Sequence, residues 1–146
     1  MIPNFTTQTK VINFKKYLYD ELRKKWVIKT PEEIVRQNCW KFLHYEKRYP
    51  KSLMVIEKKI TVNGTNKRFD ILIYNNKGKP EIIVECKAPN IKINDNVLAQ
   101  TLSYQQRLNA SYLMISNGTE TYFIKVDKEQ KKAKYLKEIP NCDFFH

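Results

Sequence analysis

The residue types best suited to chemistry lie between Arg68 and Lys87. Asp70 stands near the start of one apolar run, and Glu85 and Lys87 end a second run, with a turn rich in Asn, Gly and Pro between them. Two apolar, β-branched runs joined by such a turn predict a β-hairpin. Folding the hairpin brings Asp70 opposite the end of the second strand. Because buried like charges repel each other, two carboxylates beside a lysine indicate a bound cation or a chemical role.

Alternation along the second strand places Glu85 and Lys87 on one face and Cys86 on the other. Asp70 and Glu85 offer hard oxygen ligands, which suit Mg²⁺ or Mn²⁺ better than zinc, and the Cys86 backbone carbonyl can add another. Such a cation polarises a phosphoryl oxygen, while Lys87 can orient the attacking water and stabilise charge on the phosphate. The chemistry that this set suits is therefore phosphodiester hydrolysis. Removing either carboxylate is expected to leave the stability level or higher, because it relieves repulsion.

The alternative for Glu85 and Lys87 is an exposed ion pair at a strand end, worth about 0–1 kcal/mol. The tripeptide of Glu, any residue and Lys is weak by itself, because the chain contains three: Glu57-Lys58-Lys59, Glu85-Cys86-Lys87 and Glu129-Gln130-Lys131. The last lies in a polar run, and no Asp precedes the first within the length of a hairpin. Only the second has an aspartate 15 residues earlier, across a turn. That pairing favours Asp70, Glu85 and Lys87 as the site.

A helix is expected just before this hairpin. Thr30 can be an N-cap, Pro31 fits the first helical position, and Glu33 stands where a capping box needs its acid. The helix should run to about Tyr49 and end at Pro50. The remaining core elements are predicted as strands over Leu53–Val62, Phe69–Tyr74 and Glu81–Cys86, a helix from Asn94 or Asp95 to about Asn109, and strands over Tyr112–Ser116 and Thr121–Val126.

This order of helix, three strands, helix and two strands predicts an α/β fold, with a mixed β-sheet flanked by helices and the second helix as the crossover. One domain is expected, with a strap over residues 1–29, a core over residues 30–126 and a polar, lysine-rich tail over residues 127–146. The strap carries a partial helical stripe and also residues that suit strands, so a helix and an extended strap both remain open.

Composition favours a polyanionic partner. The 146 residues include 27 Lys and Arg against 15 Asp and Glu, a net charge of +12. A lysine-rich composition without such a partner is the alternative. Three scattered cysteines without a C-x-x-C spacing argue against a disulfide framework and a zinc site. The start has no signal-peptide pattern, and no segment approaches the ~18 apolar residues of a membrane span, so a soluble cytoplasmic protein is expected.

Together these residues resemble the PD-(D/E)XK nuclease superfamily, through Arg68-Phe69-Asp70 and Glu85-Cys86-Lys87. With the segment from Thr30 to Gln37, the core is similar to the amino-terminal nuclease domain of type I restriction enzyme R subunits. The resemblance implies a restriction-endonuclease-like fold and a Mg²⁺- or Mn²⁺-dependent endonuclease that cuts DNA in a restriction–modification system. Its metal ligands would be Asp70, Glu85 and Cys86, and its partners would be DNA and restriction-system or helicase subunits.

The second helix extends the resemblance with a Q-x-x-x-Y motif, formed by Gln100 and Tyr104. Residues four apart share a helix face, so both can reach the site or the bound strand, and Arg107 is expected to contact a phosphate one turn on. The upstream acid of the family maps to Glu33, in preference to Glu32. A capping role for Glu33 is compatible with that assignment.

One departure from the family pattern is Phe69, which stands where the family has a proline. It removes no ligand. The rival interpretation is a nucleic-acid-binding or assembly module that keeps the nuclease fold without efficient catalysis. The intact set of Asp70, Glu85 and Lys87 favours the enzyme, since a degenerate member would be expected to lose one of them. The sequence does not indicate an oligomeric state.

Overall fold

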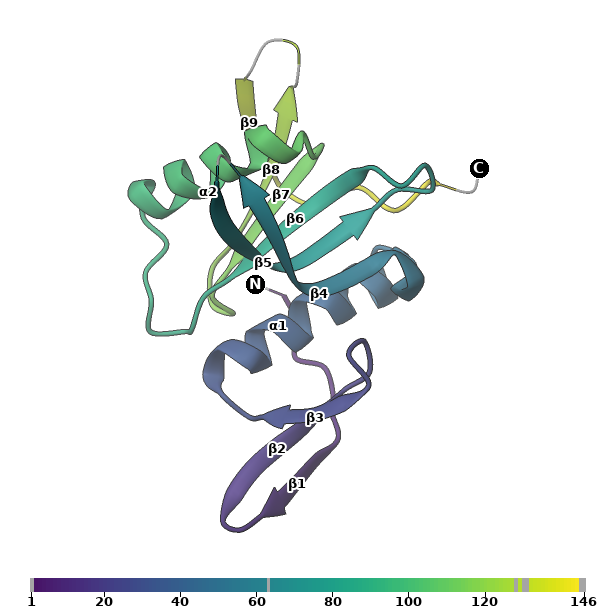
Figure 1. The fold of residues 1–146 in the computed structure, drawn as a ribbon, viewed down its shortest axis with the longest axis vertical. Coiled ribbons are helices and arrows are strands. Elements are labelled where there is room, and N and C mark those ends of the chain that lie inside the picture. The colour runs from purple at the N-terminus through teal and green to yellow at the C-terminus, as the bar shows by residue number, and fades with distance from the viewer. Residues whose placement is uncertain (1, 63, 128, 130–131, 145–146) are drawn as a thin grey trace.

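A computed structural model of the chain describes residues 2–62, 64–127, 129 and 132–144. These residues form a six-stranded and a three-stranded sheet with a helix between them (Figure 1). In chain order the elements are β1 (Thr9–Ile12), β2 (Lys15–Asp20), β3 (Lys25–Ile28), α1 (Pro31–Lys41), a π-helical turn η1 (Phe42–Glu46), a 3-10 turn η2 (Lys51–Leu53), β4 (Met54–Val62), β5 (Thr65–Tyr74), β6 (Pro80–Cys86), α2 (Asp95–Leu108), β7 (Tyr112–Ser116), β8 (Thr121–Asp127) and β9 (Lys132–Leu136).

The larger sheet is mixed, as the sequence predicts. Its strands follow the order β4-β5-β6-β7-β8-β9. All neighbours are antiparallel except β6 and β7, which pair in parallel with Val84 opposite Met114. A parallel pair needs a crossover, and α2 supplies it. The expected α/β fold, with a mixed sheet flanked by helices, is confirmed.

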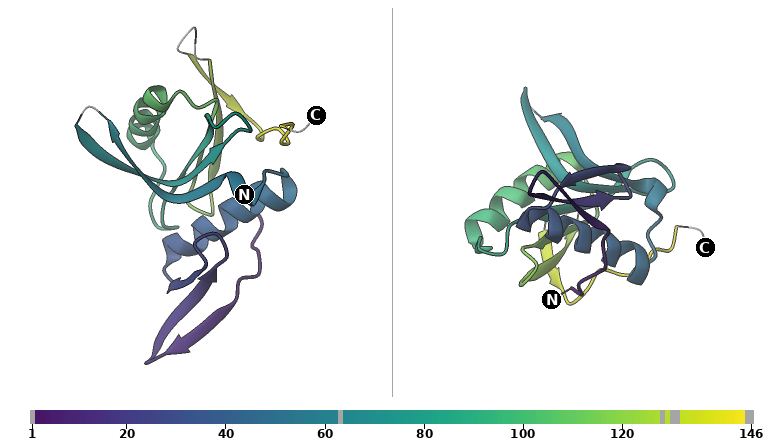
Figure 2. Two further views of the ribbon diagram at one scale, coloured as in Figure 1. Left: turned by 45° about the vertical axis from the view of Figure 1, so that its right-hand side comes forward. Right: turned by 90° about the horizontal axis from the view of Figure 1, so that it is seen from below.

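Each face of the larger sheet is covered by one helix (Figure 2). Trp40 and Cys39 of α1 are fully buried against β5 and β6 residues such as Val84. On the other face, Leu98 of α2 packs with Ile83, Leu113 and their neighbours. Because both faces are covered, the central strands consist of nearly continuous apolar runs, which is why the sequence predicts them well.

The start of α1 is as predicted, and its end is not. Thr30 has an extended backbone, and its hydroxyl accepts a hydrogen bond from the Glu33 N–H at 3.0 Å. Helical structure ends at Glu46 rather than at about Tyr49. Arg48 adopts a left-handed conformation (φ 68°), from which its N–H still bonds the His44 carbonyl. A residue in that conformation closes a helix, so the chain turns before it reaches Pro50.

Residues 1–29 are the part of the chain that the sequence predicts least well. The helical alternative is wrong, because this segment contains the three-stranded sheet β1-β2-β3. Along β2, Leu18 and Asp20 are buried whereas Tyr17 and Tyr19 are half-buried, which is the two-residue period of a strand. The apparent helical stripe included Phe14, whose side chain is in fact fully exposed.

The segment expected to be a polar tail adds a strand. β9 pairs antiparallel with β8 and forms an edge of the larger sheet. Beyond it, Ile139 is fully buried and the Pro140 carbonyl accepts a hydrogen bond from the Tyr49 hydroxyl at 2.9 Å. Exposed lysines are common on edge strands because they discourage pairing with other chains, so β9 does not stand out as a strand by hydrophobicity.

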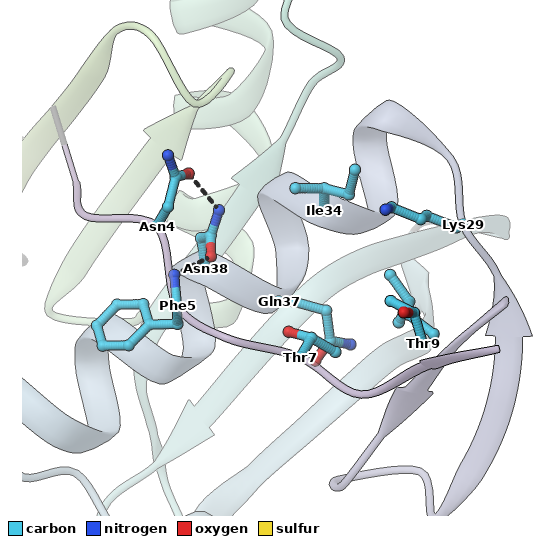
Figure 3. A pocket seen from close by; sticks show the side chains of 9 residues that line it. Asn4, Phe5, Thr7, Thr9, Lys29, Ile34, Gln37 and Asn38 are labelled. Carbon is cyan, nitrogen blue, oxygen red and sulfur yellow. Dashed lines mark hydrogen bonds between the residues drawn. The ribbon is translucent and has the colours of Figure 1, made fainter. Parts of the chain in front are cut away.

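The three-stranded sheet and the N-terminal segment are attached to α1. Leu18 lies with Ile34, Gln37 and Asn38 around a cavity of about 230 Å³ (Figure 3). Lys41 extends this attachment, since its Nζ donates to the Thr6 carbonyl at 2.9 Å and to the Thr7 hydroxyl at 2.6 Å. Helix α1 thus lies between the two sheets. Among the described residues, neither helix has the length and apolar character needed to cross a lipid bilayer.

Candidate active site

The site is built where β5 and β6 separate. The last pair in their register is Ile71 with Val84. Beyond it, the Asp70 side chain takes the place of a backbone acceptor, because its Oδ2 accepts a hydrogen bond from the Cys86 N–H at 2.7 Å. On the other side of β5 lies β4, whose residue Glu57 adopts a left-handed conformation (φ 57°). The pairing of β4 with β5 is interrupted at this residue. The register on either side would pair Glu57 with Asp70, so this interruption of the strand pairing stands opposite Asp70.

The side chains of Glu85 and Lys87 lie on the side of the sheet that faces α2. The Lys87 Nζ lies 3.3 Å from a Glu85 carboxylate oxygen, and the Lys87 backbone N–H donates to the Ser116 carbonyl at 2.8 Å. That backbone bond fixes Lys87 against β7 just past the end of β6. Both side chains line a cavity of about 170 Å³, together with residues of β5 and α2: Arg68, Phe69, Val97, Gln100 and Thr101.

The charges of Asp70 and Lys87 act on Glu85 in opposite directions. Burial raises the pKa of Glu85 to about 7, the negative charge of Asp70 adds to the rise, and Lys87 opposes it. Like charges and desolvation both disfavour the ionised form. Near neutral pH this end of the sheet therefore favours any cation that can stand between Asp70 and Glu85.

A cation from the chain itself already contacts Asp70 from the α1 side. Arg36 donates to Asp70 Oδ1 at 2.9 Å and also to Glu33, so it bridges the two acids. Burial alone would lower the pKa of Arg36, but the hydrogen bond to Asp70 and the charges of Glu33 and Asp70 outweigh it and raise that pKa above its usual value. Arg36 thus stays charged. Arg36 connects Glu33 to Asp70.

The charged network continues to the small sheet. Arg23, in the turn between β2 and β3, pairs with Asp20 and Glu33 and lies 3.4 Å from Glu57. Sequence reasoning missed this group. Arg36 could have been found, because a cation three residues after Glu33 shares its helix face. Arg23 and Glu57 gave no such signal, since each reaches the network only through tertiary structure.

Cys86 can contribute to a metal site only through its backbone. A hydrogen bond with Cys39 and complete burial raise the pKa of the Cys86 thiol well above its usual value, so the thiol stays protonated in the core. This agrees with the predicted orientation of its side chain. Among the described residues, no three His, Cys, Asp or Glu side chains gather closely enough to hold a metal ion. A donor set of Asp70, Glu85 and a carbonyl still suits Mg²⁺, which commonly binds through one or two carboxylates and several waters.

The residues predicted on the second helix divide into two groups. Gln100 lines the same cavity as Glu85 and Lys87, so the structure brings these three together. The backbones of Tyr104 and Arg107 belong to α2, but their side chains lie outside the part of the chain that the structure describes. Glu32 is exposed, with a carboxylate oxygen 3.7 Å from Arg36, whereas Glu33 is buried.

The sequence model of one protein family, the N terminus of type I restriction enzyme R protein (HSDR_N), matches residues 31–140. No curated protein matches the chain. A solved fragment structure, described as an HsdR subunit of a type I restriction enzyme from Vibrio vulnificus YJ016, is similar with a TM-score of 0.48 and 18% sequence identity. The match covers 66% of this chain and 21% of the Vibrio chain, so this chain spans about a fifth of the length of the Vibrio chain.

Proposed function

The chain belongs to the family of type I restriction enzyme R protein N termini, and from that premise we propose that it is a nuclease domain that hydrolyses DNA phosphodiester bonds with the help of a divalent cation. The observation that carries the proposal is the meeting of Asp70, Glu85 and Lys87 where β5 and β6 separate. Asp70 lies on β5, Glu85 lies on β6, and the backbone N–H of Lys87 is bonded to β7. Glu85 and Lys87 line a cavity.

Mg²⁺ is the cation that this donor set fits, held by Asp70, Glu85 and the Cys86 carbonyl. When bound, it would supply Lewis-acid activation of the scissile phosphate. The PD-(D/E)XK assignment rests on the same residues and is part of this proposal. Localisation in the cytoplasm and assembly with restriction-system or helicase subunits also remain proposals, drawn from the family.

The chain's own residues have separate roles. Lys87 lies at the cavity wall with its ammonium group 3.3 Å from Glu85, where it can orient a water and stabilise negative charge on a phosphate. Gln100 is placed to hold the DNA strand across the same cavity. Tyr104 and Arg107 are proposed as further strand contacts from α2. Glu33 acts through Arg36, which it orients toward Asp70.

The alternative function, a DNA-binding or assembly module without turnover, also has an observation in its favour. Both Asp70 oxygens accept hydrogen bonds from the protein, one from Arg36 and one from the Cys86 N–H. A cation that uses Asp70 must therefore share it with Arg36. Cleavage assays decide between the two functions.

The test measures cleavage of plasmid DNA with and without Mg²⁺, and Mn²⁺ binding by calorimetry. Glu85→Gln is expected to lose both metal binding and cleavage. Lys87→Ala should bind Mn²⁺ and cleave about a hundredfold more slowly. Lys51→Ala is the matched control, because Lys51 forms a similar ion pair, 3.0 Å from Glu21, and neither residue lines the cavity of Glu85 and Lys87.

Wild-type cleavage by Glu85→Gln would show that the site assignment is wrong. If Lys87→Ala lost metal binding together with activity, Lys87 would be a structural residue. A wild-type protein that binds DNA and Mn²⁺ but does not cut would favour the module without turnover.

A further inference from the structure

One face of the three-stranded sheet carries side chains that are half-buried or exposed, among them Tyr17, Trp26 and Ile28. Leu18 and Asp20 of β2 point toward α1 and are buried. By strand alternation, the register partners of Tyr17 and Tyr19 share the opposite face with them. We call this the outer face, and its central residues are Lys10, Ile12, Tyr17, Tyr19, Trp26 and Ile28. The sheet projects from α1 on the side away from the six-stranded sheet (Figures 1 and 2).

Aromatic rings and lysines alternate on the outer face. The rings of Tyr19 and Trp26 meet edge to face, with centroids 5.3 Å apart. The Lys10 ammonium lies 4.1 Å from the centroid of Trp26. Lys10 is also the register partner of Tyr17, and Lys15 follows on the same face toward the hairpin tip. A base can stack on such rings while the neighbouring ammonium groups meet its phosphates.

Charge on this sheet is strongly one-sided. Residues 9–29 contain seven Lys and Arg against Asp20 and Glu21. Both acids are already paired, Asp20 with Arg23 and Glu21 with Lys51. The remaining lysines match a polyanion. The cores of protein–protein interfaces are enriched in aromatic residues but depleted of lysine, so the lysines of this face, rather than its rings, favour a polyanion over a protein partner.

The hairpin tip supports an external contact. The β1–β2 turn consists of Asn13 and Phe14, both in left-handed conformations with φ of 50° and 66°. Such turns favour Asn-Gly, because a side chain at the second position strains a left-handed conformation that glycine adopts freely. Phe14 nevertheless occupies the turn with a fully exposed ring. Within the part of the chain that the structure describes, the ring is not packed, which makes a contact outside the chain a reason to keep it there.

From this geometry we propose that the outer face binds a single strand of DNA. Unpaired bases stack on Tyr17, Tyr19 and Trp26, and Lys10 and Lys15 contact phosphates. Phe14 at the tip stacks on or between bases at the edge of the strand. The inference rests on the proposed function only for the choice of DNA as ligand, and it adds a binding surface on the other side of α1 from Asp70 and Glu85.

Tryptophan fluorescence tests the proposal directly. The chain has two tryptophans, and Trp40 is fully buried, so quenching by an oligonucleotide reports on Trp26. An oligothymidylate of about 12 nucleotides is expected to quench it. Trp26→Phe should abolish the quenching with little loss of affinity, which is measured by anisotropy of a labelled oligonucleotide.

Two substitution sets separate stacking from charge. Tyr17→Ala with Trp26→Ala should weaken binding about tenfold or more at a temperature at which melting curves show the variant to be folded. The plot of log affinity against log salt has a negative slope, and Lys10→Gln with Lys15→Gln should make it less steep by about 1.4. Tyr135→Ala is the matched control, because Tyr135 is an exposed tyrosine of β9 next to Lys134, and it should bind like wild type.

The proposal is overturned if the oligonucleotide leaves Trp26 fluorescence unchanged, or if a blunt duplex of equal length quenches it as strongly. It is also overturned if wild type is a dimer by light scattering that the Tyr17 and Trp26 substitutions dissociate, because a second copy would then cover the face. Failure here is distinct from failure of the proposed function. Asp70→Asn should lose cleavage and keep the quenching, and a protein without nuclease activity can still show the quenching.

Discussion

The two sheets of this molecule differ in whether their charged side chains are paired within the chain. At the end of the six-stranded sheet, the acids Asp70 and Glu33 are buried and neutralised by Arg36 from the same chain. On the three-stranded sheet, lysines of the outer face remain at the surface beside aromatic rings. Charge that is compensated inside the chain contributes to the fold as well as to a site. Charge that the chain leaves uncompensated is available to an outside partner.

The largest loss of stability is expected when the ion pair of Asp70 and Arg36 at the six-stranded sheet is broken. Asp70→Ala leaves the buried Arg36 without one of its two close acids and the Cys86 N–H without its acceptor. Breaking a buried pair from one side costs about 3–5 kcal/mol. Repulsion between carboxylates alone predicts a level or raised stability for this change, and the contact with Arg36 reverses that expectation.

Urea unfolding measures this loss. Asp70→Ala combined with Arg36→Met should recover a large part of it, because the second change removes the buried cation that the first leaves unpaired. If Asp70→Ala were as stable as wild type, charge compensation at this sheet would be irrelevant to the fold, and the contrast between the sheets would fail.

A smaller effect should distinguish the two faces of the three-stranded sheet. Leu18 is only 2% exposed and faces α1. Leu18→Ala is expected to cost about 2–3 kcal/mol, toward the lower end for buried leucines, because the side chain borders a cavity of about 230 Å³ and packs less completely. Tyr17→Ala on the outer face should change stability by less than about 1 kcal/mol. Thermal unfolding of the two variants compares the faces, and equal losses would mean that the outer face is also packed.

The same contrast explains what the sequence could predict. Strands such as β6 and β7 are buried on both faces, so their apolar runs predicted them to within a residue or two. Thr30 and Pro31 likewise predicted the start of α1, because capping is local chemistry. The pairing of Asp70 with the end of β6 also followed from local signals, namely a turn and strand alternation.

The remaining features depend on distant parts of the chain. Strands β1 to β3 bury few side chains, so apolar and polar residues alternate only weakly along their sequence. The same residues also fit a partial helical pattern, which left the sequence ambiguous. The left-handed conformation of Glu57 and the reach of Arg23 to Glu33 arise only when strands and helices pack. The sequence therefore predicted that Asp70 lies against the end of β6, and it missed the arginines that pair with Asp70 and Glu33.

The last prediction concerns the one acid at the site whose charge is poorly compensated. In the folded protein, burial and the charge of Asp70 raise the pKa of Glu85 from 4.5 to about 7, although Lys87 opposes this. A group with a raised folded-state pKa keeps its proton in the native state after the unfolded chain has lost it. Between pH 4.5 and 7, the unfolded state therefore binds fewer protons, and the contribution of Glu85 to stability falls as pH rises.

Glu85→Gln removes this titration with little change in shape. Without Mg²⁺, the variant should match wild type near pH 4.5 and become more stable than wild type by on the order of 2 kcal/mol at pH 8. Urea unfolding of both proteins across this range measures the difference, with Glu21→Gln as an exposed control that should show no such trend. A constant difference at every pH would mean that Glu85 is ionised throughout, and that Lys87 compensates it as fully as Arg36 compensates Asp70.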